Sequence, residues 1–246
     1  MQKSLWMLWV ALFSCLPVLA QDESDLPIQN LNVGFHMSNR GPGLSFGYNL
    51  GDPNYRQWTF NLDFFVVKDL RETSIEPLVA DQGRPYIYGK LHHFLTASPS
   101  VGLEWPLFRS SSLNPFNVKG GFKLGPSVGF LNPYQIETLT LVAGSVNQYS
   151  IEVEAFDPSE HAHGDILGRA NFLSSRLQPN IQAGLSLKTY TIIDFTRSQY
   201  GIGGLMLSAQ ADVFLKPVPI LAEINGRTNR QTFFAVSLGL LFGRAW

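Results

Sequence analysis

The chain has 246 residues, a formal net charge of −1, and 45% hydrophobic against only 15% charged residues. This near-neutral balance, without a basic cluster, argues against nucleic acid as a partner. No long unbroken apolar run follows residue 20, so a helical membrane protein is not expected. Apolar residues spread over short alternating segments instead indicate an all-β protein with an apolar outer surface.

The first twenty residues predict a cleavable export signal. Lys3 is their only charged residue, the apolar run 5–19 follows it, and Val18 and Ala20 suit a signal peptidase that cuts after Ala20. We therefore expect a signal peptide at 1–20 and one outer-membrane β-barrel domain at 21–246, exported through the periplasm. Cys15, in a loose lipoprotein box, leaves lipidation as an alternative; otherwise the mature chain has no cysteine and no disulfide.

A period of two recurs along the remaining chain, with turn residues between the alternating segments. In the first segment Leu31, Val33, Phe35 and Met37 share one face, and the Gly-rich stretch 38–43 then predicts a turn. Pro99 predicts a bulge or local break in the fourth segment. The eight predicted strands cover about 30–37, 44–50, 57–66, 86–105, 118–130, 180–188, 205–213 and 234–242.

An even number of strands places both termini on the periplasmic side of a barrel. The connections 38–43, 69–85, 138–176 and 216–230 then face outward, while 189–204 is long for a periplasmic turn and could extend a strand at 190–195. The last strand, ending Phe242-Gly243-Arg244-Ala245-Trp246, should pair with the first, with Trp246 at the periplasmic rim. The prediction is an eight-stranded antiparallel up-and-down transmembrane β-barrel.

The opposite face of these strands is rich in Gly, Ser and Asn, which favours a barrel over a soluble periplasmic β-sandwich. A few charged residues share this inward phase, where isolated charges would be costly, so we expect them to pair inside the barrel. They are Asp63, Glu104, Lys119, Lys123, Lys188 and Asp212. An eight-stranded barrel has room for such side chains but little for a pore.

Several short motifs resemble a group of uncharacterised outer-membrane β-barrel proteins from Bacteroidetes-type bacteria. They are Tyr88-Gly89-Lys90-Leu91-His92-His93-Phe94, the run 125–134 (GPSVGFLNPY), Phe156-Asp157-Pro158-Ser159-Glu160-His161, Leu167-Gly168-Arg169-Ala170-Asn171-Phe172 and the closing residues 242–246. The resemblance runs from about Val33 to the C-terminus and implies this fold and location. It implies no catalytic residue, and His92 and His93 stand where amides are expected.

One motif suggests catalysis. His36-Met37-Ser38-Asn39 is similar to the His-x-Ser-Asn signature of outer-membrane lipid A deacylases, in which a histidine activates a serine for attack on an acyl ester. His36 and Ser38 share a strand face, but Asp52, the nearest downstream acid, lies at the other end of the next strand. An ordinary inward histidine beside a turn is the alternative interpretation.

The remaining candidates lie in the long outer connection. Asp157, His161 and His163 form part of a cluster with Glu160 and Asp165 that could bind a metal, although such residues in an outer loop are usually solvated. The run 201–204 (GIGG) lacks the Lys-Ser/Thr of a phosphate loop. We expect no cofactor.

Three functions remain open at this stage. The first is a non-enzymatic barrel, surrounded by outer-membrane lipid and built by the barrel-assembly machinery through its last strand. Its loops 69–85 and 138–176 would bind a ligand or an envelope protein. The second is a lipid A deacylase-like hydrolase using His36 and Ser38, and the third is a narrow channel.

Overall fold

The computed structural model describes residues 29–52, 55–77, 83–108, 116–141, 149–158, 160–161, 164–170, 180–195, 201–223 and 228–245, which form strands and connecting loops. The predicted signal peptide, Cys15, His163 and Trp246 lie outside these residues. Among the described residues, no helix is long and apolar enough to cross a membrane.

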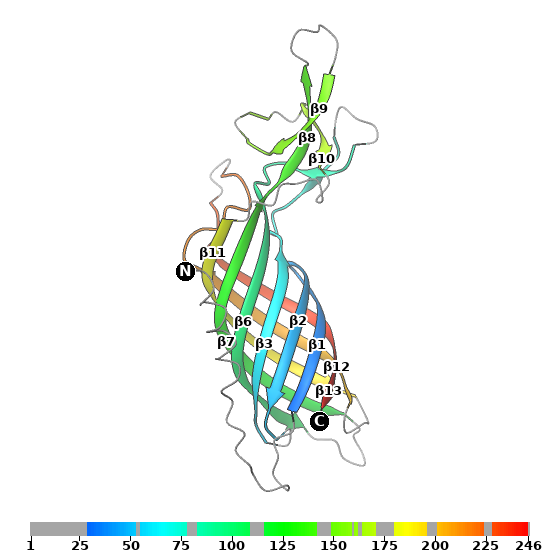
Figure 1. Ribbon diagram of the computed structural model, residues 1–246, viewed down its shortest axis with the longest axis vertical. Coiled ribbons are helices and arrows are strands. Elements are labelled where there is room, and N and C mark those ends of the chain that lie inside the picture. Colours follow the sequence, from blue (N-terminus) through cyan, green and yellow to red (C-terminus); the bar gives the residue numbers. More distant parts are fainter. Residues whose placement is uncertain are drawn as a thin grey trace, which may run out of the picture.

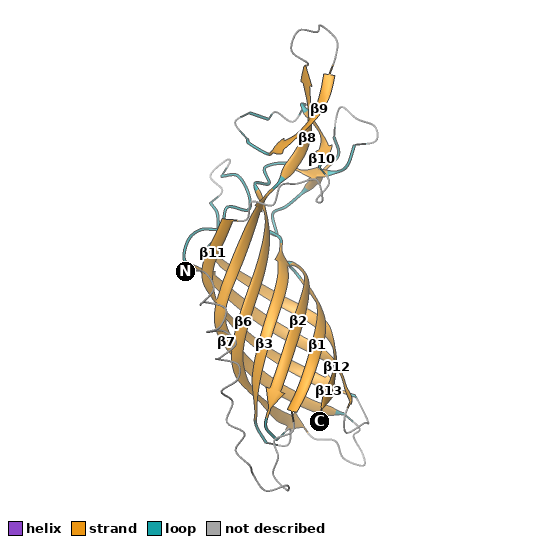
Figure 2. Ribbon diagram, viewed as in Figure 1, coloured by secondary structure: helices purple, strands orange, loops and turns teal. Residues whose placement is uncertain are grey.

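Eight long strands close into one barrel, so the predicted fold class is confirmed (Figures 1 and 2). The strand order around the barrel is β1-β13-β12-β11-β7-β6-β3-β2, with every pair antiparallel. The strands are β1 (Gln29–Ser38), β2 (Gly41–Leu50), β3 (Gln57–Val67), β6 (His92–Phe108), β7 (Asn117–Pro133), β11 (Asn180–Asp194), β12 (Gly201–Phe214) and β13 (Thr232–Ala245).

The last strand pairs with the first, as predicted. Val33 lies opposite Phe242, and Phe35 opposite Leu240, so the outward apolar faces of β1 and β13 are continuous. Phe35 is 59% exposed and Leu240 is 49% exposed. A closed sheet satisfies every backbone group between strands, and an apolar outer surface suits hydrocarbon, so the two features together describe a transmembrane barrel.

The largest differences from the predicted strand boundaries are in β6, β11 and β12. β6 begins at His92, because Tyr86 and Ile87 belong to a separate hairpin, and β11 and β12 are longer than predicted. Only residues 195–200 therefore remain between β11 and β12. In β6, pairing with β7 stops after Ala97 and resumes at Val101 in the same register. That register places Pro99 opposite Pro126, and neither residue has an N–H for the ladder.

The two long outer connections are not plain loops, which corrects the prediction for 69–85 and 138–176. Residues 68–91 contain the short strands β4 (Ser74–Ile75) and β5 (Tyr86–Ile87). Residues 134–179 contain β8 (Gln135–Leu141), β9 (Tyr149–Ala155) and β10 (Ile166–Arg169), in the sheet order β10-β8-β9. Figure 1 shows this sheet projecting beyond the barrel, and we call these two sheets and their connections the cap.

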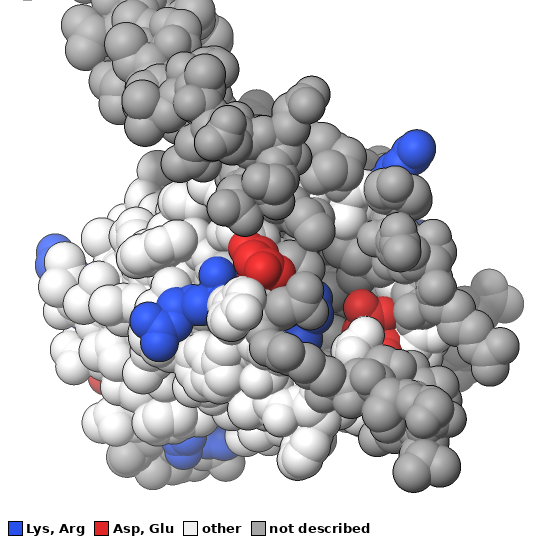
Figure 3. Space-filling model, turned by 90° about the horizontal axis from the view of Figure 1, so that it is seen from below, with Lys and Arg blue, Asp and Glu red and all other residues white. Residues whose placement is uncertain are grey.

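The cap is connected directly to a strand of the barrel wall. A single residue, Tyr134, separates β7 from β8, so one nearly continuous stretch of chain rises from the barrel into the cap. At the opposite end of the molecule, coloured acidic and basic side chains lie close to one another around the barrel mouth (Figure 3). The side chains coloured in that view form no extended surface of one charge.

Candidate functional site

The barrel interior holds a network of polar side chains, in which four of the six predicted inward charges form ion pairs, whereas Lys123 and Asp212 contact uncharged groups. Lys188 Nζ lies 3.1 Å from Asp63 Oδ1, and both side chains are almost fully buried. The Tyr190 hydroxyl donates to Glu104 at 3.0 Å, and Lys119 lies 3.7 Å from the same carboxylate. Lys123 Nζ sits over the Tyr190 ring, 4.4 Å from its centroid. Buried charges require such partners, and these contacts supply them across the lumen.

Asp212 completes the set of predicted inward charges. Its two carboxylate oxygens accept hydrogen bonds from the Gln210 amide at 3.0 and 2.9 Å. Neutral pairs continue the layer around the wall, with Ser98 bonded to Ser127 and Ser208 bonded to Ser237. The interior is therefore held together by side chains from most of the barrel strands.

A buried apolar layer lies at the end of the barrel nearest the cap. Phe94 packs against Phe214 and Phe233, with ring centroids 5.1 and 5.6 Å away. The buried cluster also includes Phe65, Val67, Leu131 and, from the β12–β13 connection, Val218, Ile220 and Leu221. Arg40, in the β1–β2 turn, lies over the Phe233 ring and donates from Nε to the Phe234 carbonyl at 2.7 Å. This layer separates the polar interior from the cap side.

His36 and Ser38, the candidate catalytic pair, have different hydrogen-bond partners. The His36 Nε2 lies 2.7 Å from the Ser45 hydroxyl on β2, and both residues are buried in the lumen. The Ser38 hydroxyl donates to the Gly41 carbonyl at 2.7 Å and accepts the backbone N–H groups of Arg40 and Gly41. Ser38 therefore stabilises the turn, and Asp52 lies at the other end of β2.

Two glycines make room for the His36 ring. A Cβ at Gly34 would lie 2.7 Å from His36 Nε2, and a Cβ at Gly239 would overlap His36 Nδ1. His36 also lies 5.9 Å from the Phe65 ring, centroid to centroid. The glycines in the inward phase thus have a packing role, and the histidine lies below the apolar layer that Phe65 helps to form.

Of the candidate metal ligands, His161 and Asp157 are described. His161 is buried, with its ring stacked on Phe156 and its Nδ1 within 3.0 Å of the Asp157 backbone N–H. Its Nε2 lies 3.5 Å from a Glu154 carboxylate oxygen. Within the described residues, no group of three or more His, Cys, Asp or Glu side chains could hold a metal ion. His161 instead joins β9 to the loop that follows it.

The cap has its own apolar core, which includes Tyr134 and Phe156 from two of the motifs of the family resemblance. The buried residues are Tyr86, Tyr134, Ile136, Phe156 and Ile166. The Tyr134 hydroxyl accepts the Ile87 backbone N–H at 3.0 Å, which joins the β7–β8 stretch to β5. Tyr88 packs edge-on against Phe156, with ring centroids 5.5 Å apart. The cap is thus a folded unit with a defined interior.

Ion pairs stabilise the connection 68–91 at the base of the cap. Lys90 Nζ lies 2.7 Å from Glu72 Oε2, with both side chains buried. Burial lowers the pKa of Lys90, while the hydrogen bond and charge of Glu72 oppose that shift. Asp69 accepts Arg71 Nη2 at 2.8 Å. Burial alone would raise the pKa of Asp69, but the hydrogen bonds and charge of Arg71 hold it below its ordinary value.

The outward face of the cap sheet carries exposed apolar side chains, together with Glu137 opposite Val153. Leu139 lies opposite Ile151 in the β8–β9 pair, and Val153 follows on the same face. These three side chains are 37%, 65% and 46% exposed, in that order. The sequence between residues 135 and 170 also contains six acids, Glu137, Glu152, Glu154, Asp157, Glu160 and Asp165, against a single basic residue, Arg169. The cap sheet therefore exposes apolar side chains in a segment rich in acids.

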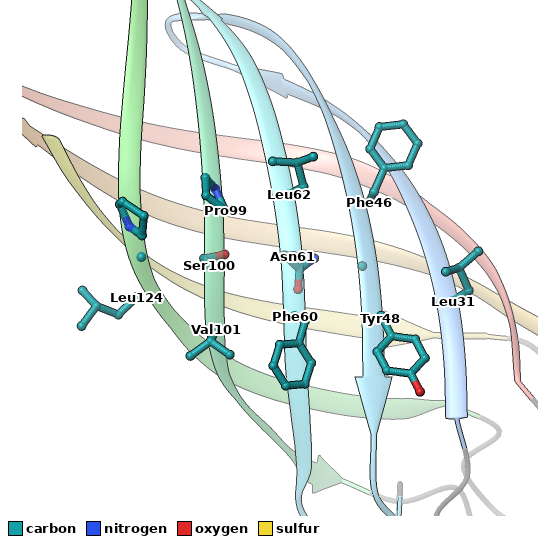
Figure 4. Close-up of a pocket in the computed structure, with 13 residues that line it drawn as sticks. Leu31, Phe46, Tyr48, Phe60, Asn61, Leu62, Pro99, Ser100, Val101 and Leu124 are labelled. Carbon is teal, nitrogen blue, oxygen red and sulfur yellow. The ribbon is translucent and has the colours of Figure 1, made fainter. Parts of the chain in front are cut away.

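The outer wall of the barrel carries an apolar groove of about 560 Å³. It crosses β1, β2, β3, β6 and β7, with Phe46 and Phe60 among the residues that border it (Figure 4). Pro99 and Pro126, the residues that interrupt the β6–β7 ladder, also line it. Because the groove lies within the membrane-facing wall, its chemistry suits a hydrocarbon chain.

No family model and no curated protein matches this chain. Among solved structures, it is similar to neisserial surface protein A, at 9% identity over 89% of this chain and 95% of that one, with a TM-score of 0.41. It is also similar to Ail, the attachment invasion locus protein of Yersinia pestis, solved with the heparin analogue sucrose octasulfate (11% identity, 90% and 99% covered, TM-score 0.38). A third is the outer membrane protein OprG from Pseudomonas aeruginosa (10% identity, 90% and 95% covered, TM-score 0.35). At such scores, the fold assignment rests on the closed strand order of the chain itself.

Proposed function

We propose that this chain is a non-conducting, non-enzymatic barrel of the bacterial outer membrane that presents its cap to a protein outside the cell or in the envelope. The observation that carries this proposal is the contrast between a filled lumen and an exposed apolar cap face. The lumen is occupied by the Asp63–Lys188 layer and closed by the Phe94 layer. The cap holds Ile151 and Val153 out in water, where only a partner would cover them.

The same proposal covers the surroundings of the barrel. The exposed apolar faces of β1 and β13 support contact with outer-membrane lipid, and the groove near Pro99 and Pro126 would take a lipid acyl chain. The strand β13, which closes the barrel on β1, would be the element that the barrel-assembly machinery binds during insertion. Export through the periplasm requires the signal at 1–20.

Conductance in planar bilayers tests the filled lumen. We expect no channel events from the purified full chain, because both the ion-pair layer and the aromatic layer lie across the lumen. Steady ion conductance by a correctly folded sample would contradict this part of the proposal and favour the narrow channel.

Cysteine labelling of intact cells tests the orientation. Ile151→Cys in the cap should react with a membrane-impermeant maleimide, because the side chain is exposed on the outer sheet. Arg56→Cys, which is exposed at the opposite end of the barrel, is the matched control and should react only after the membrane is opened. The reverse pattern would place the cap in the periplasm and end the proposal.

Lipid A mass spectra test the hydrolase alternative. Cells that express the wild type or Ser38→Ala should show the same acyl chains, because the Ser38 hydroxyl is engaged in the turn with Gly41. Loss of an acyl chain that depends on Ser38 would establish the enzyme instead.

A further inference from the structure

The strand β9 forms one edge of the cap sheet. The sheet order is β10-β8-β9, and β9 pairs with β8 along its whole length, from Gln135↔Ala155 to Leu141↔Tyr149. Within the part of the chain that the structure describes, no strand adjoins the other side of β9. An edge of this kind can take an added strand through main-chain hydrogen bonds.

The two faces of β9 have different chemistry. Ile151 and Val153 lie on the outward apolar face, whereas Glu152 and Glu154 alternate with them on the other. Glu154 accepts the Thr138 hydroxyl at 2.6 Å and lies near His161, but Glu152 is exposed and has no ion pair among the described residues. A strand beside β9 would therefore meet apolar and acidic side chains in alternation.

A second copy of this chain fits the edge poorly. Antiparallel pairing of two β9 strands about their centres would put Glu152 opposite Glu152, and like charges directly opposite each other destabilise a sheet. The rest of the segment 135–170 adds to this repulsion, since it contains six acids and a single Lys or Arg residue, Arg169. A strand with basic residues at those positions would be attracted by the same charges.

We propose that the open edge of β9 binds an extended segment of a partner protein in which apolar residues alternate with Lys or Arg. The apolar residues would lie beside Ile151 and Val153, and the basic residues beside Glu152 and Glu154. Main-chain hydrogen bonds to β9 would hold the segment, and the alternation would set its register. The inference rests on the proposed function, because it specifies how the cap would recognise its partner.

A peptide-binding experiment tests the proposal on the full chain in nanodiscs of zwitterionic phosphatidylcholine. The probe is a fluorescent seven-residue peptide that alternates valine and lysine, and empty nanodiscs correct for binding to lipid. We expect saturable binding, together with slower amide hydrogen exchange in residues 149–155. The same peptide with glutamate in place of lysine, or with a central proline, should not bind, because it lacks either the charge or the backbone hydrogen bonds.

Charge variants locate the site. Glu152→Lys combined with Glu154→Lys should weaken binding of the lysine peptide about tenfold or more and allow the glutamate peptide to bind. The matched control, Glu160→Lys with Asp165→Lys, makes the same change in net charge at exposed cap positions outside β9. It should change the affinity less than about twofold. Glu152→Lys alone keeps the Glu154 contacts with Thr138 and His161, and should show part of the loss.

Several results would overturn the inference. They are failure of the lysine peptide to bind, equal effects of the two charge variants, protection that maps away from β9, or self-association of the chain detected as a cross-link between two copies of the Ile151→Cys variant. Failure here leaves the proposed function standing if Ile151→Cys is still labelled on intact cells and the barrel does not conduct. Loss of that labelling would instead contradict the proposed function itself.

Discussion

The barrel and the cap are built from the same alternating strand pattern, but the pattern has different surroundings in each. Leu240 on β13 and Ile151 on β9 are exposed to a similar degree, at 49% and 65%. Leu240 belongs to a belt that runs around a closed sheet, so hydrocarbon is its natural environment. Ile151 stands in a small open sheet beyond the barrel, so water or a partner must be its environment. Exposure alone therefore does not reveal function; the closure of the sheet decides its meaning.

The interiors differ as well. The barrel buries charges such as Asp63 and Lys188 beside an apolar layer that includes Phe94, whereas the buried core of the cap consists of aromatic and branched apolar side chains such as Tyr134 and Ile136. The cap stands in water and needs an ordinary apolar core.

The largest expected effect lies in the buried ion pair of the barrel. Asp63→Leu leaves Lys188 charged and unpaired in the lumen, and we expect it to lower the free energy of unfolding by about 3 to 5 kcal/mol. Urea unfolding in lipid vesicles measures this change. The double variant Asp63→Leu with Lys188→Met should recover most of the loss. If the double variant is no more stable than the single one, the pair is not what holds these strands together.

A pair of matched substitutions separates lipid from water as the environment of the exposed apolar residues. Leu240→Arg should lower the free energy of unfolding of the barrel by about 2 to 4 kcal/mol, because it places a charge in the lipid-facing belt. Ile151→Arg, at a similarly exposed position, should cost less than about 0.5 kcal/mol. Both are measured by urea unfolding in vesicles, with amide exchange to follow the cap. Equal costs at the two sites would contradict the assignment of their environments.

The barrel could be predicted from the sequence because each of its long strands repeats the period-two pattern several times. The closure of the barrel could also be predicted, because Val33 in the first strand and Phe242 in the last strand belong to matching apolar faces. The cap sheet was not predicted, although Ile151 and Val153 do alternate with Glu152 and Glu154. That alternation is short and lies in a polar region, and β4, β5 and β10, of two to four residues, are too short to show any period.

The partner of His36 could not be predicted from its neighbours in sequence. Residues two apart share a strand face, but they lie about 7 Å apart along the strand. Side chains on the adjacent strand approach more closely, and the absence of a side chain at Gly34 lets the His36 ring reach Ser45. The turn at Asn39 and Arg40 meanwhile engages Ser38. The geometry of the candidate site therefore depends on which residues of adjacent strands lie opposite each other. The sequence alone does not reveal this register.

A smaller effect is expected from the hydrogen bond that joins the cap to the stretch rising from β7. Tyr134→Phe removes the acceptor for the Ile87 N–H, and an unpaired backbone donor in this partly buried place should cost about 1 to 3 kcal/mol. Amide exchange of residues 86–87 should become faster, while that of the β13 strand stays unchanged. Tyr88→Phe, in the same hairpin connection, is a matched control. Faster exchange throughout the barrel would show that the cap and barrel unfold as one unit.

The smallest expected effect is a loss of stability of the cap at acidic pH. The Thr138 hydrogen bond, with a further contribution from His161, holds the pKa of Glu154 below its ordinary value. A lowered pKa in the folded state adds stability above the pKa of the free carboxyl group, about 4.3, and that stability is lost as the pH falls through the folded value. Because the Glu154 side chain is 43% exposed, solvent screening should keep the effect below about 1 kcal/mol.

Limited proteolysis and amide exchange of residues 149–155 between pH 6 and pH 3 measure this loss. After correction for the intrinsic exchange rate at each pH, we expect the amides of β9 to have lower protection factors at the acidic end in the wild type. Glu154→Gln should show a weaker dependence on pH because it has no carboxyl group to protonate. The barrel should show no matching change, since its strands are held by the closed hydrogen-bond ladder and the membrane. If β9 and β13 loosen together over the same range of pH, the cap is not an independently stabilised surface, and the contrast between the two regions would have to be abandoned.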